Sequence, residues 1–190
     1  MKKLPFLLSS KKIEIKGKRV FLRALKLSDT ARLCFLLNDK EIFENTSFQP
    51  PVTFEKEKKF ILDSQKKLKK GEEIVWGIDL KKEKTLVGCI SLKKIDWIDR
   101  KAEVGYWLGK DWRGRGLMTE ALGLVLNFSF EKLKLHRIFA FVFSDNIASQ
   151  RVLEKMGFKK EGELREHKYR FGKWKDAIVF GILEKEFNKK

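Results

Sequence analysis

The chain has 190 residues, of which 43% are hydrophobic and 12% aromatic, so it can bury the core of one domain. This composition excludes a disordered chain, which is poor in apolar and aromatic side chains. The 43 Lys and Arg against 26 Asp and Glu leave a formal net charge of +17, which favours an anionic partner such as nucleic acid, a membrane or a cofactor. Because lysine supplies most of this charge, a heat-adapted surface is an equal explanation.

Hydrophobic periodicity and turn residues predict one α+β domain over residues 1–190. The first half of the chain predicts a strand, three helices and three meandering strands, at residues 19–23, 28–37, 40–44, 55–71, 74–80, 86–92 and 102–108. The second half predicts a helix, a strand, a helix and two strands, at residues 118–133, 136–143, 148–156, 158–166 and 174–184. We expect Ser28 and Asp29 to cap the first helix and Gly157 to end the last one. The order indicates a mixed sheet rather than a doubly wound parallel one.

Cysteine usage predicts a reduced protein without a metal centre. Cys34 and Cys89 form neither a CxxC pair nor a zinc site with the two histidines. The apolar run at residues 4–8 is too short for a signal peptide, and no run approaches the ~18 apolar residues of a membrane span. We therefore expect a soluble, cytoplasmic protein with no membrane contact.

The strongest local pattern is the turn Arg113-Gly114-Arg115-Gly116 between a predicted strand and a long predicted helix. A helix N-terminus offers unpaired N–H groups to phosphate, and glycines let the backbone approach an anion closely. The pattern lacks the ending of a Walker A loop and the context of a Rossmann fingerprint. Taken alone, it is also compatible with a tight solvated turn.

A second pattern starts the last predicted helix, where Asn146 is followed by Ser149. Taken alone, it is compatible with a helix-capping Asn beside a surface Ser.

Together with residues 102–108 (AEVGYWL), the stretches 113–122 and 146–158 resemble the GNAT superfamily of N-acetyltransferases. More narrowly, they resemble the branch that acetylates protein N-termini, including the RimJ/RimL-like ribosomal-protein alanine acetyltransferases. The similarity extends over about residues 19–187. It implies a mixed, mostly antiparallel sheet of about seven strands flanked by helices and splayed between the fourth and fifth strands.

The resemblance also implies that acetyl-CoA is the acetyl donor and that no metal takes part. Backbone amides after Arg113 would cradle its pyrophosphate, and Asn146 and the strand before the turn would bind its pantetheine arm. Met118 departs from the small residue usual in the family motif, where the backbone amide does the binding. The implied cofactor-binding residues are Tyr106, Trp107, Leu108, Arg113, Gly114, Arg115, Gly116, Leu117, Met118, Thr119 and Asn146.

Acetyl transfer to an amine needs a base for the amine proton and an acid for the departing thiolate. Many family members place a tyrosine acid where this chain has Leu153, so the resemblance assigns the proton donor to Ser149. Glu103 is the candidate base, acting through water. The alternative for Glu103 is an exposed strand carboxylate paired with a lysine.

The resemblance favours transfer to a primary amine, most simply a protein or peptide N-terminus, including that of a ribosomal protein. A small-molecule amine is the alternative acceptor, although a net charge of +17 disfavours a polyamine. A more distant alternative is a non-catalytic module that binds RNA or the ribosome, supported by charge alone. We expect acceptor-binding loops at residues 38–51 and either a monomer or a homodimer.

Overall fold

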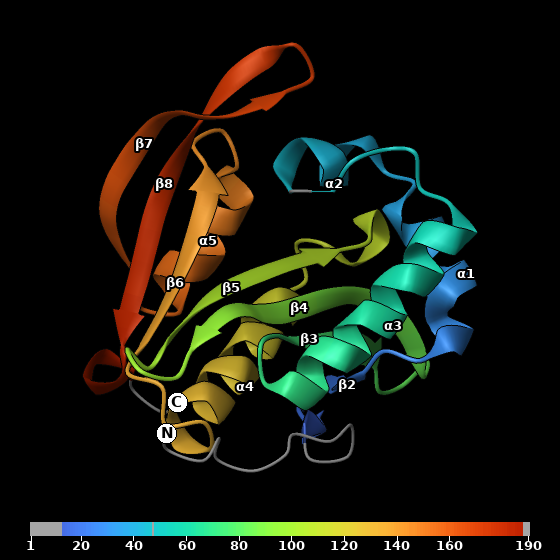
Figure 1. The fold of residues 1–190 in the computed structure, drawn as a ribbon, viewed down its shortest axis with the longest axis horizontal. Helices are drawn as coiled ribbons and strands as arrows, with labels where there is room; N and C mark the ends of the chain where they lie inside the picture. Colours follow the sequence, from blue (N-terminus) through green and yellow to red (C-terminus); the bar gives the residue numbers. More distant parts are fainter. Residues whose placement is uncertain (1–12, 47, 188–190) are drawn as a thin grey trace.

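The computed structural model describes residues 13–46 and 48–187, so the apolar run at residues 4–8 lies outside the described residues. The described part of the chain forms one eight-stranded sheet in the order β1-β2-β3-β4-β5-β6-β8-β7 (Figure 1). All neighbouring strands are antiparallel except β5 and β6, which are parallel. This is the mixed α+β fold predicted from the sequence, with one strand more than expected.

The bounds of the elements follow the predicted order. The strands are β1 (Ile15–Lys16), β2 (Val20–Ala24), β3 (Ile74–Leu80), β4 (Thr85–Asp96), β5 (Lys101–Leu108), β6 (Arg137–Phe143), β7 (Lys159–Arg170) and β8 (Lys173–Leu183). The α-helices are α1 (Thr30–Leu37), α2 (Lys40–Asn45), α3 (Phe54–Lys70), α4 (Leu117–Glu131) and α5 (Ile147–Lys155). Short 3-10 helices, which the periodicity did not predict, are η2 (Leu27–Asp29), η3 (Lys110–Trp112) and η4 (Glu184–Glu186).

The helix ends show which capping residues could be predicted from the local sequence. The side chain of Thr53 caps α3, and Gly71 ends that helix in the left-handed region at φ +69°. Gly157 follows α5 at φ +88°, as predicted. Asp29 is the N-cap residue of α1, as predicted, but its side chain makes no capping bond to that helix, because the carboxylate pairs with Arg23 and accepts the amide of Lys26 instead.

Helices cover both faces of the sheet (Figure 1). On one face, α4 packs its buried residues Ala121, Leu122 and Val125 into the larger of two apolar clusters. On the other face, α1 and α3 form a smaller cluster that includes Ile61, Trp107 and Cys89. None of the helices in the described residues is long and apolar enough to cross a membrane.

The sheet is open between β5 and β6. The two strands pair only where Lys101, Ala102 and Glu103 face Arg137, Ile138 and Phe139, and then diverge (Figure 1). The splay predicted between the fourth and fifth strands is therefore confirmed. Past Glu103, no strand of residues 13–46 or 48–187 pairs with β5 on that edge, so part of its backbone is available to a ligand.

Candidate active site

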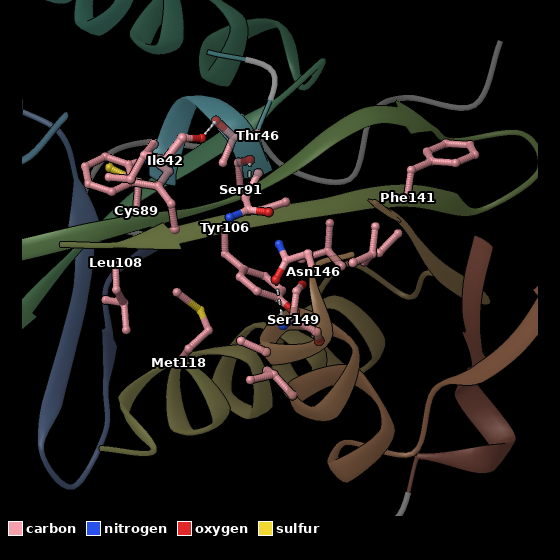
Figure 2. A pocket seen from close by; sticks show the side chains of 18 of the residues that line it. Ile42, Thr46, Cys89, Ser91, Tyr106, Leu108, Met118, Phe141, Asn146 and Ser149 are labelled. Carbon is pink, nitrogen blue, oxygen red and sulfur yellow. Dashed lines mark hydrogen bonds between the residues drawn. The ribbon is translucent and has the colours of Figure 1, made fainter. Parts of the chain in front are cut away.

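A pocket of about 820 Å³ occupies this opening. Because successive residues of a strand face opposite sides, β5 lines the pocket from both faces of the sheet. Tyr106 and Leu108 point toward α4 and α5, whereas Ser91 and Cys89 lie on the opposite side of the strand (Figure 2). Every predicted site residue lines this pocket except Arg115.

One end of the pocket is the N-terminus of α4. Gly116 is the N-cap, lies at φ +71° and has no side chain to cap the helix. The amides of Leu117, Met118 and Thr119 form the first turn, where backbone N–H groups have no acceptor within the helix. These three residues line the pocket, so the helix presents free donors and its positive dipole end to it.

Arg19 and Glu120 hold the turn before α4 in place. The Arg19 guanidinium donates to the carbonyls of Arg115 and Gly116 at 2.8 and 3.1 Å, and its Nε donates to Glu120 Oε2 at 2.9 Å. Glu120 Oε1 accepts the amides of Arg19 and Val20, which fastens β2 to the same turn. Despite desolvation, the hydrogen bonds from Arg19 and Val20 lower the pKa of Glu120, so it stays a carboxylate at neutral pH. The turn carbonyls are thereby directed to Arg19 rather than to the pocket.

The side chains of the two arginines in the turn have different surroundings, and neither is a free cation inside the pocket. Arg113 donates to Asp39 Oδ2 and Glu41 Oε2 at 2.5 Å each, and its Nε donates to the carbonyl of Leu108. Arg113 therefore connects the turn to α2, and its charge is offset by two carboxylates. Arg115 lines no part of the pocket, and its carbonyl binds Arg19.

Helix α2 lies over the opening and is fastened at both ends. Arg113 binds its start through Asp39 and Glu41, and Lys175 of β8 donates to the carbonyl of Glu44 near its end at 3.0 Å. Lys175 is buried and also pairs with Asp145 Oδ2 at 2.9 Å. Residues Glu41, Ile42, Asn45, Thr46 and Phe48 line the pocket, so the region expected to hold acceptor loops does border it.

Asn146, Ser149 and Tyr106 meet in the middle of the pocket (Figure 2). Asn146 Oδ1 caps α5 by accepting the amide of Ser149 at 3.1 Å, which leaves its Nδ2 as the donor for a ligand. Ser149 Oγ lies 3.0 Å from the hydroxyl oxygen of Tyr106. Burial raises the pKa of Tyr106 well above its usual value although the bond to Ser149 lowers it, so the phenol stays protonated at neutral pH.

Glu103 lies on the other face of β5. Its Oε2 accepts from Lys94 Nζ at 2.8 Å, which is the lysine pairing considered as the alternative role from the sequence. The side chain still lines the pocket and is largely shielded, with 18% of its surface exposed. Glu103 and Ser149 thus approach the opening from opposite faces of the sheet.

Sequence reasoning missed several residues of the pocket. Arg151 and Lys155 line it from α5 and pair with no carboxylate in the described part of the chain. Ala148, Arg151 and Lys155 are spaced three and four residues apart, so the sequence could have indicated that they lie on one face of α5, the face that lines the pocket. Lys93, His167 and Lys168 line the pocket from β4 and β7. These strands are far apart in the strand order, so the local sequence gives no signal that the three side chains share a pocket.

A family model described as an acetyltransferase (GNAT) domain matches residues 19–159. The chain belongs to the GNAT acetyltransferase family. It is 38% identical over 174 residues to a Bacillus subtilis (strain 168) protein named "Probable N-acetyltransferase YjcK", a match covering 89% of this chain and 96% of the relative. As in other members of this family, the GNAT domain uses acetyl-CoA as its acetyl donor.

Two solved structures resemble this GNAT domain over most of its length. The ribosomal-protein-S5-alanine acetyltransferase from Vibrio fischeri is 25% identical with a TM-score of 0.83, and the match covers 93% of this chain and 99% of the other. A chimera of the spermidine N-acetyltransferase SpeG from Vibrio cholerae and hSSAT is 26% identical with a TM-score of 0.79, covering 88% of this chain and 97% of the other. The similarities therefore establish an N-acetyltransferase and leave the acceptor open.

The residues present fit acetyl-CoA. The unpaired backbone of β5 and Asn146 Nδ2 can form hydrogen bonds with the amides of the pantetheine arm. The N–H groups at the uncapped start of α4 can bind the pyrophosphate. Arg151 and Lys155 add the positive charge that Arg113 does not. No group of three or more His, Cys, Asp or Glu side chains within residues 13–46 and 48–187 could hold a metal ion.

Proposed function

We propose that the protein acetylates the N-terminal α-amine of a peptide or protein by direct attack of the amine on the thioester of acetyl-CoA. The observation that carries this proposal is the charge of the pocket on the Glu103 face of the sheet. Its carboxylates Glu73 and Glu103 already pair with Lys67 and Lys94, at 2.7 and 2.8 Å. A polyamine would thus find its counter-charges occupied, whereas an α-amine, whose pKa is only about 8, reacts as the neutral form.

The residue roles follow from the two faces of β5. In the proposed reaction the amine nitrogen bonds to the acetyl carbon, and the bond from that carbon to sulfur breaks. Glu103 takes the amine proton through water, and the Ser149 hydroxyl gives a proton to the departing sulfur. Tyr106 is a positioning residue, because its hydroxyl holds Ser149 Oγ at 3.0 Å. The amides of Leu117, Met118 and Thr119 bind the pyrophosphate.

The comparisons support an N-terminal acceptor without deciding it. The resemblance to a ribosomal-protein-S5-alanine acetyltransferase favours a ribosomal protein as the acceptor, and the resemblance to a spermidine acetyltransferase favours the alternative. We favour the peptide acceptor over the polyamine because Glu73 and Glu103 already pair with lysines. We further propose a cytoplasmic location, which the free thiols of Cys34 and Cys89 support.

The test is acetyl-CoA consumption with a panel of free N-terminal peptides, their N-terminally blocked counterparts, spermidine and glucosamine. We expect kcat/KM to be highest for a free peptide by about tenfold or more, a difference of about 1.4 kcal/mol in transition-state binding. Mass spectrometry should place the acetyl group on the α-nitrogen. A higher kcat/KM for spermidine or glucosamine than for every peptide would refute the proposal.

A further inference from the structure

Two lysines in the pocket lack a counter-ion. Lys93 ends the regular part of β4, and Lys168 reaches the same pocket from β7. Both are half-buried, and neither forms an ion pair with any carboxylate among the described residues. Lys94, beside them, is already committed to Glu103.

The surroundings of these lysines are themselves positive. Burial lowers the pKa of Lys168, and repulsion by Arg170, Lys94 and Lys93 lowers it further, although Glu103 raises it. His167 adds no further positive charge at pH 7, because burial and repulsion by Lys168 lower its pKa, although Glu103 raises it. A half-buried charge without a partner is costly, and an anionic ligand placed between Lys93 and Lys168 would remove that cost.

Lys93 lies next to the candidate base. It is opposite Glu103 in the β4–β5 register, so the two side chains share one face with about 5 Å between their Cβ atoms. Lys93 Nζ lies 3.7 Å from the position of a Cβ on Gly105, which places the ammonium over the strand that forms the pocket floor. Gly105 lies two residues along β5 from Glu103, which is about 7 Å, so one or two residues of an extended acceptor, at about 3.3 Å each, would reach from the neighbourhood of Glu103 to this ammonium.

We propose that Lys93 and Lys168 bind an acidic side chain at the second or third position of the acceptor. This inference rests on the proposed N-terminal acetylation and narrows its substrates to acidic N-terminal sequences. The lysines have a second effect, because nearby positive charge favours the neutral form of the incoming amine. A basic N-terminus would meet two unpaired cations at the same place.

The experiment compares three peptides that start with Ser and differ only at positions two and three, which are both Asp, both Asn or both Arg. For the unmodified enzyme we expect kcat/KM for the Asp peptide to exceed that for the Asn peptide by about tenfold, and the Arg peptide to be the poorest. In Lys93→Gln/Lys168→Gln the ratio of Asp to Asn peptide should fall to about one, mainly through KM. Lys93→Glu/Lys168→Glu should favour the Arg peptide.

Lys82→Glu is the matched control for Lys93→Gln/Lys168→Gln, because both change the net charge of the protein equally. Lys82 lies in the exposed β3–β4 turn away from the pocket, so this variant should leave the ratio of Asp to Asn peptide unchanged. Melting temperature and acetyl-CoA affinity verify that each variant is folded. Equal use of the three peptides by the unmodified enzyme, or a preference for Asp that survives Lys93→Gln/Lys168→Gln, would overturn the inference.

Binding is measured separately from turnover, with fluorescent versions of the same peptides and protein saturated with CoA. A tighter Kd for the Asp peptide that Lys93→Gln/Lys168→Gln abolishes supports the lysine site even if no peptide is acetylated. In that case only the proposed function fails. If peptides are acetylated and the Kd values do not differ, only the lysine site fails.

Discussion

At the scale of single residues, the hydroxyls of Ser149 and Tyr106 form the contact on which proton delivery depends in our proposal. They come from α5 and β5, 43 positions apart in the chain, and lie 3.0 Å from each other. Because Tyr106 keeps its proton at neutral pH, its hydroxyl can donate either to the Ser149 carbonyl, 3.3 Å away, or to Ser149 Oγ, and the second arrangement leaves the serine proton free for the sulfur.

Ser149→Ala should lower kcat by about a hundredfold, since general acid catalysis contributes roughly 10²–10⁴. Acetyl-CoA affinity should change by less than about twofold, because the proton is needed only when the C–S bond breaks. Steady-state kinetics and calorimetric titration with acetyl-CoA measure the two effects. Equal losses in kcat and in acetyl-CoA affinity would contradict the assignment of Ser149 as the proton donor.

Tyr106→Phe retains the ring and removes only the hydroxyl. We expect a smaller loss in kcat than in Ser149→Ala, on the order of tenfold, and little further loss when both are changed, because residues that act as a unit are not additive. The matched control is Tyr169→Phe, a half-exposed phenol in the β7–β8 hairpin. Full additivity of the two losses would show that Tyr106 does not act through Ser149.

The same scale shows where sequence reasoning ends. The glycines before α4 were predictable because a helix start without a side-chain cap has a local pattern. The partners of Arg113 were not, since Asp39 and Glu41 lie more than 70 positions earlier in the chain and only the fold brings them to the turn. The local sequence pattern predicted an anion-binding site, but it could not show which basic side chains lack a carboxylate partner and can bind the anion.

At the scale of elements, Arg19 and Glu120 connect strand β2, which lies between β1 and β3, to the start of α4. Arg19→Met should weaken acetyl-CoA binding by about tenfold, because two carbonyl contacts worth about 1 kcal/mol each before solvent screening no longer orient the turn. The fold should persist, since the core on α4 is untouched. Isothermal titration measures the affinity, and circular dichroism verifies the fold.

Arg165→Met is the comparison for Arg19→Met, because Arg165 is exposed on β7 and does not line the pocket. It removes the same charge from a net +17 protein and should leave the acetyl-CoA affinity unchanged. If both variants lose affinity equally, overall charge and not the turn contact is responsible.

Elements with a buried face were predictable within a few residues, as α4, α5 and the β3–β5 meander show. The predicted strand at 158–166 fell short, because β7 continues to Arg170. Its last residues are mostly charged and are held by pairing with Lys173, Trp174 and Lys175 rather than by a buried pattern of their own. Strand β1 has two residues, too few for any periodicity to appear.

At the scale of the whole molecule, the Glu57 carboxylate works against stability. It is buried in the first part of α3, and its Oε2 has no hydrogen-bond partner. Burial raises its pKa, although Lys56 lowers it. The folded state therefore binds this proton more tightly than the unfolded chain, and stability is lost as pH rises through the folded pKa.

Glu57→Met should raise the melting temperature at neutral pH by several degrees, since an unsatisfied buried polar group costs about 1–3 kcal/mol and 1 kcal/mol corresponds to roughly 2–4 °C at this size. The gain should shrink as pH falls below the unfolded pKa of about 4.3 and vanish near about pH 3, where the carboxyl is protonated in both states. Thermal melts across pH measure it. Glu55→Met, an exposed neighbour in the same turn, should show no such gain. A pH-independent gain would rule out titration of Glu57 as the cause.

The opening between β5 and β6 has a consequence for how large an acceptor can be. Tyr106, Asn146 and Ser149, which we propose for the donor, lie on the α4 and α5 side of β5 (Figure 2). Glu103 and its cross-strand neighbour Lys93, which we propose for the acceptor, face the other side. In our proposal the donor and the acceptor therefore approach the thioester from opposite faces of the sheet. Only the outermost tail of an acceptor has to thread the opening, so the bulk of a folded protein can stay outside while its first residues react.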